Sequence, residues 1–168
     1  MIEIQTPISD EVVQKLNVGD MVYISGEIFC GRDAVLPKIV QMIEQETIIK
    51  TGIELQGSVI FHTAVSPAGV GPTSSNKLEI ESSMETLSKA GVKFHLGKGE
   101  IKPETIEALK KNNSVYLVMP PVTALLESKT LEKKVVAFPE LGMEAFYRLR
   151  VERYPAIVGA AHGRSIYE

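Results

Sequence analysis

The sequence lacks the features that mark several common classes of protein. Among its 168 residues there is one cysteine, Cys30, and no tryptophan. A lone cysteine excludes a disulfide within the chain. An iron–sulfur cluster needs three or four thiolates, so this chain cannot hold one alone. The three histidines, His62, His95 and His162, are too dispersed for a zinc motif. We therefore predict no metal site in this chain.

The charge and the short apolar runs exclude further classes. The net charge of −3 argues against a nucleic-acid-binding protein, which needs a basic face. No apolar run approaches the roughly 20 residues of a membrane-spanning helix. Residues 1–5 lack the basic start and the apolar core of a signal peptide. We expect a cytoplasmic protein in which residues 1–168 form a single domain, because this length buries a sizeable core.

What is present is an alternation of strand and helix patterns. Amphipathic stretches predict helices over residues 9–16, 34–46, 77–90 and 103–112, and one or two helical turns over 123–126. Apolar runs predict strands over residues 21–29, 57–63, 92–96, 114–119, 134–138, 145–151 and 156–159. This alternation predicts an α/β fold. The strand-rich C-terminal third favours a mixed sheet over a purely parallel one.

Three local features refine this prediction. Asp33 is the expected N-cap of the helix over residues 34–46, because its carboxylate can accept from the first backbone amides. Gly26, inside the strand over residues 21–29, is expected to mark a bulge or bend. The polar tail from His162 onward is expected to fray.

Cationic residues and a helix start follow three of the predicted strands. Arg32 stands between a strand and a helix, and Lys98 lies between two glycines after the strand over residues 92–96. Gly71-Pro72-Thr73 precedes the helix that begins near Lys77, with Ser74 or Ser75 as its N-cap, and unpaired amides at a helix start attract anions. In open α/β sheets such ends meet at one edge. The set predicts an anion site there, although each member alone also fits a surface residue or an ordinary capped helix.

The ordered motifs of the chain resemble the β region of the iron–sulfur hydro-lyases, the family of class I fumarases and two-subunit L(+)-tartrate dehydratases. The motifs are Gly31-Arg32-Asp33-Ala34, Gly71-Pro72-Thr73, Gly97-Lys98-Gly99, Phe138-Pro139-Glu140-Leu141-Gly142-Met143-Glu144-Ala145 and Tyr154-Pro155-Ala156. Each motif is short, but their order along almost the whole chain is specific. The resemblance implies a swivelling β/β/α domain. It implies the β subunit of a fumarate hydratase, which interconverts malate and fumarate plus water.

The resemblance also implies a role for four residues. The family's carboxylate-binding arginine falls on Arg32, and its catalytic threonine, which acts in acid–base chemistry, falls on Thr73. Its second substrate-binding arginine falls on Lys77, and its substrate-binding lysine falls on Lys98. A 4Fe-4S cluster would be held by three cysteines of a partner α subunit, in an α2β2 assembly whose active site lies between the subunits. Such a set suits a dicarboxylate, because two carboxylates need two cationic clamps.

Departures from the family pattern leave alternatives open. Lys77 replaces an arginine, so a bidentate clamp becomes a point charge. Val35-Leu36 stands where many members have Ala-His. One alternative is the β subunit of L(+)-tartrate dehydratase, with the same reaction type and another substrate. The other is a stand-alone anion-binding module without activity.

Overall fold

The structure is a computed structural model of the chain. It describes residues 2–66, 69–73, 77–119 and 123–167, and for residues 66, 69–73, 77–80, 123 and 124 it describes the backbone alone. The strands are β1 (Ile2–Gln5), β2 (Met21–Cys30), β3 (Val59–Phe61), β4 (Thr63–Ser66), β5 (Gly69–Thr73), β6 (Phe94–Gly97), β7 (Val115–Val118), β8 (Thr130–Ala137), β9 (Phe146–Ala161) and β10 (Arg164–Ser165). The helices are α1 (Asp10–Lys15), α2 (Leu36–Glu44), α3 (Lys77–Lys89), α4 (Pro103–Lys111) and α5 (Thr123–Ser128), with short 3-10 helices η1 (Ile48–Thr51) and η2 (Pro139–Glu144).

Five strands pair into a closed, barrel-like ring. β2 pairs in parallel with β3, β3 with β6, and β6 with β7. The long strand β9 runs antiparallel to both β7 and β2 and so closes the ring. β1, β8 and β10 extend the sheet, while β4 and β5 form a separate antiparallel pair. The predicted α/β fold with a mixed sheet is confirmed.

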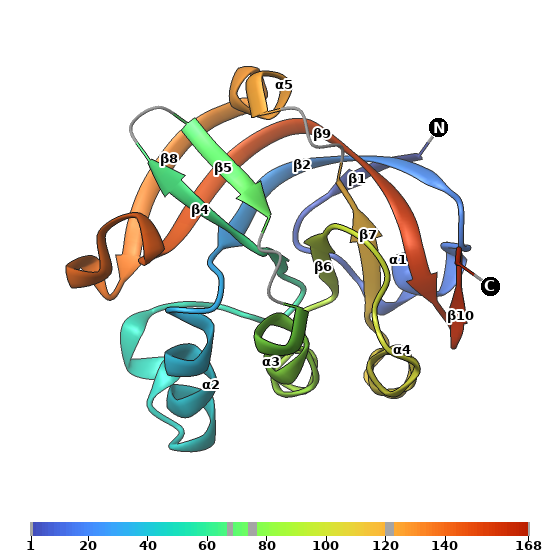
Figure 1. Cartoon of the computed structure of the whole chain (residues 1–168), viewed down its shortest axis with the longest axis horizontal. Coiled ribbons are helices and arrows are strands. Elements are labelled where there is room, and N and C mark those ends of the chain that lie inside the picture. The colour runs from blue at the N-terminus through green and yellow to red at the C-terminus, as the bar shows by residue number, and fades with distance from the viewer. Residues whose placement is uncertain (1, 67–68, 74–76, 120–122, 168) are drawn as a thin grey trace.

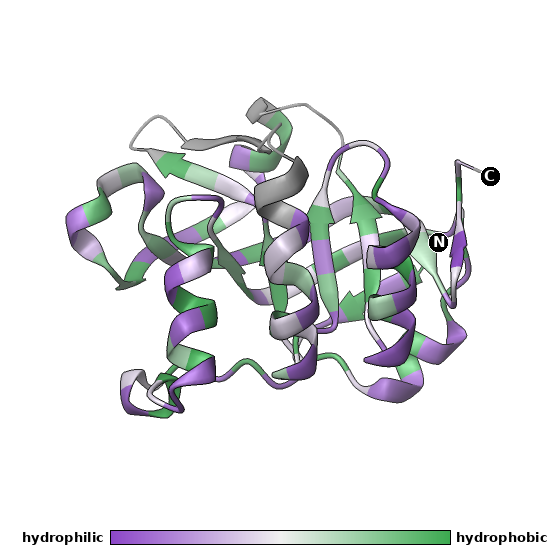
Figure 2. Cartoon of the chain, turned by 60° about the horizontal axis from the view of Figure 1, so that its bottom comes forward, coloured by the Kyte–Doolittle hydropathy of each residue, from purple (hydrophilic) through white to green (hydrophobic). Residues whose placement is uncertain are grey.

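The elements form three layers (Figure 1). The long strands β2 and β9 arch over one side of the shorter strands β3, β6 and β7. Helices α2, α3 and α4 lie in a row on the other side. Figure 2 shows hydrophilic residues on the solvent side of these helices and hydrophobic strands behind them. This is the β/β/α arrangement that the sequence led us to expect. Of the helices in the described ranges, none combines the length and apolar character that a bilayer crossing requires.

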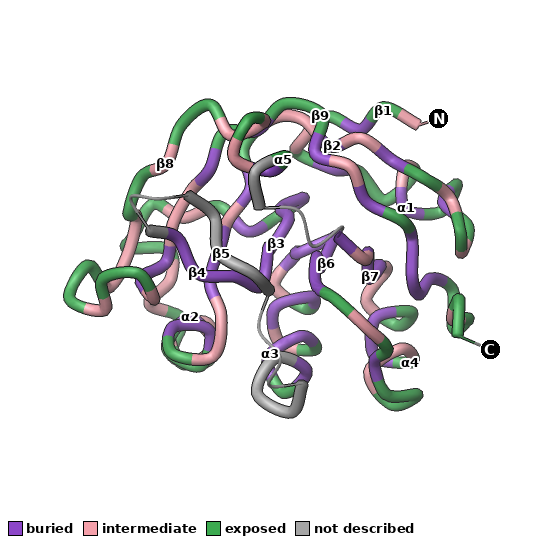
Figure 3. Tube along the Cα trace, turned by 45° about the horizontal axis from the view of Figure 1, so that its top comes forward, coloured by how far each residue is buried: buried purple, intermediate pink, exposed green. Residues whose placement is uncertain are grey.

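Two large apolar clusters hold the layers together. The cluster inside the ring includes Phe61, Phe94 and Tyr154, whose side chains are at most 1% exposed. The cluster between the sheet and the helices includes Leu36 and Ile39 of α2. Burying each large apolar side chain contributes roughly 1.5–3 kcal/mol. Figure 3 shows the consequence: β3 and β6 are buried along their length, whereas β8 at the rim alternates between exposed and intermediate residues and has no buried one.

The predicted helix over residues 9–16 and the predicted bulge at Gly26 are confirmed. Ser9 caps α1, because its hydroxyl accepts a hydrogen bond from the Val12 amide at 3.3 Å. Gly26 lies at a register shift between β2 and β9 and has a φ of +112°. This left-handed conformation favours glycine, since it has no Cβ.

Other local predictions are wrong. Asp33 is not a helix N-cap: the amides of Val35 and Leu36 both donate to the Arg32 carbonyl, and this turn delays the start of α2 to Leu36. The two strands predicted over residues 145–151 and 156–159 are one strand, β9, which continues through a bulge where Arg153 has a φ of +52°.

The extent of several strands also differs from the prediction. The strand predicted over residues 134–138 begins earlier, as β8. The tail does not simply fray, since β10 pairs with β9. The strand β1 was not predicted. Nor was the β4–β5 pair, which turns residues 71–73 from a predicted loop into the end of a strand.

Candidate active site

The carboxyl ends of the parallel strands lie at one level of the sheet. Cys30 of β2 pairs with Phe61 of β3, Phe61 pairs with Leu96 of β6, and Leu96 pairs with Leu117 of β7. The Gly31 amide donates to the Phe61 carbonyl at 3.0 Å, which extends the alignment past the strand end. Residues two positions beyond the paired ones are therefore also level with one another.

Two of these positions hold residues that the sequence singled out, Arg32 and Lys98. Arg32 follows Cys30 by two residues, Thr63 follows Phe61 by two, and Lys98 follows Leu96 by two. Adjacent strands lie about 4.8 Å apart, and β3 lies between β2 and β6, so the backbones at Arg32 and Lys98 are separated by roughly twice that spacing. Arg32 and Lys98 thus follow the ends of β2 and β6, the two strands that flank β3; that their side chains form one site stays a prediction.

Thr73 reaches the same edge through the β4–β5 pair. Its Cα pairs with that of Thr63, the first residue of β4. β4 follows directly after β3, so this end of the β4–β5 pair adjoins the parallel strands. Lys77, four positions later, is the first residue of α3, and β5 ends close to this helix start (Figure 1). The side chains of Thr73 and Lys77, and the predicted N-cap at Ser74 or Ser75, lie outside the described residues.

Arg32 is held by the carboxylate of Glu144. Its Nε donates to both carboxylate oxygens of Glu144, at 2.8 Å and 3.0 Å. Asp33 lies further away, with an Nε–Oδ1 distance of 3.8 Å. Arg32 and Glu144 are each a little under one third exposed, so this ion pair is half-buried. Glu144 belongs to a motif that the sequence singled out, yet neither spacing nor resemblance gave it a role.

Lys98 lies in the bend after β6. Its side chain is exposed, and Gly99, which follows it, has a φ of +76° that favours glycine. The bend turns the chain away from the sheet directly after the lysine. An ammonium group on such a bend can approach an anion at the strand edge.

Cys30 lies beneath this edge and is inert. The residue is fully buried, and its thiol donates to the Thr63 carbonyl at 3.2 Å. Burial raises the pKa of the Cys30 thiol far above its ordinary value, and the nearby Glu144 carboxylate adds to this effect. A thiol that stays protonated is a poor nucleophile. The interpretation of Cys30 as a small buried residue is confirmed.

Two histidines form a buried chain of hydrogen bonds beside the site. His62 Nε2 lies 3.1 Å from His95 Nδ1, and His95 Nε2 lies 2.9 Å from the Ser88 hydroxyl on α3. Both rings are completely buried, and burial lowers the pKa of His95 to about 3. His95 is therefore neutral at pH 7. Sequence reasoning interpreted both as strand residues but could not see that they meet, because 33 residues separate them.

The donor chemistry of this chain does not fit an iron–sulfur cluster. Its one cysteine is buried, protonated and committed to a backbone carbonyl. Across the described ranges, His, Cys, Asp and Glu side chains nowhere gather in threes as a metal site would need. No step of the chemistry considered below is assigned to a metal held by this chain.

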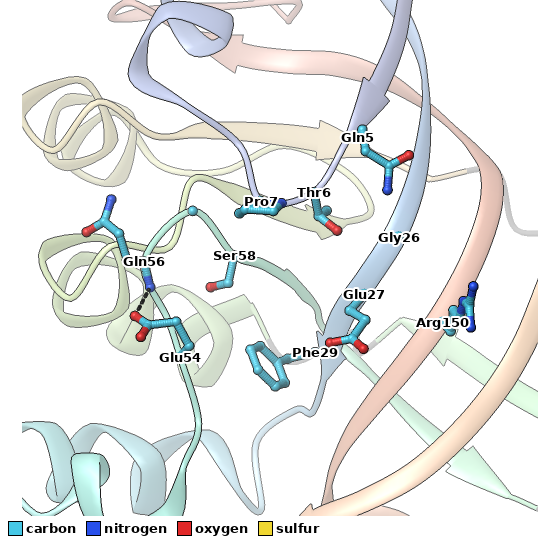
Figure 4. A pocket seen from close by; sticks show the side chains of 11 residues that line it. Gln5, Thr6, Pro7, Gly26, Glu27, Phe29, Glu54, Gln56, Ser58 and Arg150 are labelled. Atoms are coloured by element: carbon cyan, nitrogen blue, oxygen red, sulfur yellow. Dashed lines mark hydrogen bonds between the residues drawn. The ribbon is translucent and has the colours of Figure 1, made fainter.

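A separate cavity opens at the opposite end of β3. Its volume is about 450 Å3, and it lies where Ser58 leads into the strand. Figure 4 shows that Glu27 and Arg150 reach it from β2 and β9, while Glu54 and Gln56 approach from the loop before β3. Neither Arg32 nor Lys98, the predicted site residues whose side chains the structure describes, lines this cavity.

Comparison with known proteins identifies the family. The family model described as "Fumarase C-terminus" matches residues 1–168, the whole chain. This chain therefore belongs to the fumarase C-terminus family, as the motifs led us to expect.

Several named relatives agree with this assignment. A Methanocaldococcus jannaschii protein named "Putative L(+)-tartrate dehydratase subunit beta" is 32% identical, with 93% of this chain and 86% of that protein covered. A Geobacillus stearothermophilus protein named "Putative fumarate hydratase class I" is 30% identical over all of this chain, which spans 34% of that protein. The Escherichia coli "L(+)-tartrate dehydratase subunit beta" is 29% identical, with 96% of this chain and 84% of that protein covered.

Proposed function

We propose that this chain is the β subunit of an iron–sulfur hydro-lyase, a fumarate hydratase that interconverts malate and fumarate plus water. One observation carries the proposal. The register of the parallel strands brings Arg32, Lys98 and the backbone of Thr73 to one edge of the sheet. Cationic groups and a hydroxyl-bearing residue at one edge suit a small hydroxy-dicarboxylate.

Each residue has a distinct role in this proposal. Arg32 binds one substrate carboxylate, because a guanidinium offers parallel hydrogen bonds to two oxygens. Lys98 and Lys77 bind the other carboxylate as point charges. Thr73 moves a proton to or from the substrate once both carboxylates are fixed. Fixing both ends first is what turns a random encounter into an oriented reaction.

The proposal requires a partner. A 4Fe-4S cluster would be held by cysteines of an α subunit, and the active site would lie between the subunits of an α2β2 assembly. Two of the relatives are named as a subunit beta, which supports such a partner. This chain would contribute the carboxylate clamps and the hydroxyl, and the α subunit would contribute the cluster.

The β subunit of L(+)-tartrate dehydratase is a second candidate. Relatives with that name are matched over 86% and 84% of their length, whereas the fumarate hydratase is matched over 34% of its length. This chain therefore matches most of each tartrate dehydratase subunit but only about one third of the fumarate hydratase. Both candidates use the same clamps and differ in the second hydroxyl of the substrate.

Co-expression with a cluster-bearing α subunit from the same organism tests the proposal. The complex is purified without oxygen, and fumarate formed from malate and oxaloacetate formed from L-tartrate are measured in parallel. Turnover of malate alone supports the fumarate hydratase, and turnover of tartrate alone replaces it with the tartrate enzyme. A cluster-loaded complex that is inactive on both substrates would refute both candidates. Failure to form any complex would favour the stand-alone anion-binding module.

A further inference from the structure

We infer that Glu144 is a positioning residue that orients Arg32 for a substrate carboxylate. This inference rests on the proposed function, because it concerns the arginine of the same site. The two residues come from distant parts of the chain, 112 positions apart. Arg32 follows β2, and Glu144 ends η2. Their contact therefore fixes the arginine from outside its own loop.

The hydrogen bonds use only one of the five N–H groups of the arginine. Both Glu144 oxygens accept from Nε, at 2.8 Å and 3.0 Å. Among the described residues, every hydrogen bond of Arg32 is made by Nε. The two terminal nitrogens carry the other four N–H groups, arranged as a fork that matches a carboxylate. Glu144 thus holds the side chain by its stem and leaves the fork for a ligand.

Glu144 is itself held in place. Ala145 and Phe146, which follow it, are 1% and 0% exposed. The Phe146 ring stacks on Phe29 of β2 with a centroid separation of 5.2 Å, and the Ala145 amide donates to the Gly142 carbonyl at 3.0 Å. The carboxylate therefore projects from a backbone anchored in the core, against the same strand that leads to Arg32.

Charge alone does not explain the contact. A carboxylate beside a substrate-binding arginine cancels its charge and weakens its attraction for a dianion. The compensating gain is orientation: a long, flexible side chain loses rotational freedom when it is immobilised, and Glu144 imposes that loss before the substrate binds. A competing account holds that Glu144 occupies Arg32 and must be displaced by substrate. The two accounts predict changes in KM of opposite sign.

Three variants of the α–β complex separate these accounts. Glu144→Ala removes the anchor, Glu144→Gln keeps an amide oxygen that can accept from Nε, and Asp33→Asn is the matched control. Asp33 carries the same charge near the same atom, but its 3.8 Å separation is beyond a hydrogen bond. For Glu144→Ala we expect KM to rise about three- to tenfold with kcat nearly unchanged. We expect Glu144→Gln to restore most of the wild-type KM, and Asp33→Asn to leave KM unchanged.

A lower KM in Glu144→Ala would overturn the inference in favour of competition. An unchanged KM in an active complex would also overturn it, while the proposed function stood. A second measurement needs no activity: the Arg32 Nε–H signal in 15N NMR spectra of the isolated chain. We expect slow exchange with solvent in the wild type and in Asp33→Asn, and fast exchange in Glu144→Ala. Equal exchange in all three proteins would refute the Glu144 anchor even if neither substrate were turned over.

Discussion

Acidification should destabilise this protein through His95. The ring is fully buried, and burial lowers its pKa from an ordinary value of 6.5 to about 3. Below pH 6.5 the unfolded chain binds a proton at His95 that the folded chain does not bind. Because the unfolded state then binds more protons, the free energy of unfolding must decrease as the pH falls.

The two pKa values set the size of this loss. Relative to neutral pH, the unfolded state gains about 1 kcal/mol at pH 5.5 and about 2 kcal/mol at pH 5.0. The full effect is reached near pH 3 and is about 5 kcal/mol. It is the difference between the two pKa values of His95, 6.5 and about 3, multiplied by about 1.36 kcal/mol per pH unit. Domains are stable by only about 5–15 kcal/mol, so this one residue decides much of the acid stability.

Urea unfolding between about pH 7.5 and pH 5.0 measures the effect, since carboxylates titrate mostly below this range. His95→Gln removes the buried ring. His162→Gln is the control, because it also removes a histidine but from an exposed position. We expect the wild type and His162→Gln to lose about 2 kcal/mol more than His95→Gln over this interval. Parallel pH profiles for all three proteins would refute the reasoning.

Other changes should act on the site and on the fold in distinct ways. In the α–β complex, Thr73→Ala should lower kcat at least about 100-fold and change KM little, because a proton-transferring hydroxyl acts mainly in the transition state. Steady-state kinetics measure both constants, and a near-normal kcat would show that Thr73 does not transfer the proton. Arg32→Lys should chiefly raise KM for the dicarboxylate, since a point charge replaces a fork, and an unchanged KM would contradict the clamp. Gly26→Ala should lower the free energy of unfolding, measured in urea, by about 2 kcal/mol or more. The added Cβ would overlap the Thr6 hydroxyl, and the backbone at this position is left-handed. Wild-type stability would contradict this. Cys30 should react with a thiol reagent at least about 100-fold more slowly in the folded protein than in urea, and equal rates would contradict its burial.

The sequence predicted elements whose signals are local. The helix over residues 9–16, which Ser9 caps, and the bulge at Gly26 depend on a few neighbouring atoms, and both are found. Asp33 shows the limit of such signals. Its side chain suits a cap, but the amides of Val35 and Leu36 bond to the Arg32 carbonyl and start the helix later. The sequence likewise predicted two strands, over residues 145–151 and 156–159, whereas a bulge at Arg153 lets them continue as the single strand β9.

Contacts between distant residues could not be predicted in this way. The Arg32–Glu144 pair and the His62–His95 pair join segments 112 and 33 positions apart, and neither has a spacing that a motif would reveal. The resemblance supplied the candidate site residues but not their supporting contacts.

The register of the parallel strands decides where the site forms, and the packing on both faces of the sheet sets this register. Phe61 and Leu96 point into the ring, while Ile60 packs toward the helices and His95 bonds to α3. A slip of one residue would reverse these faces and expel large apolar side chains from both clusters. Because both faces of β3 are buried, its sequence is apolar throughout and carries no alternation from which the register can be read. The alignment of the strand ends at the candidate site is therefore a consequence of core packing. This packing becomes visible only in the assembled sheet.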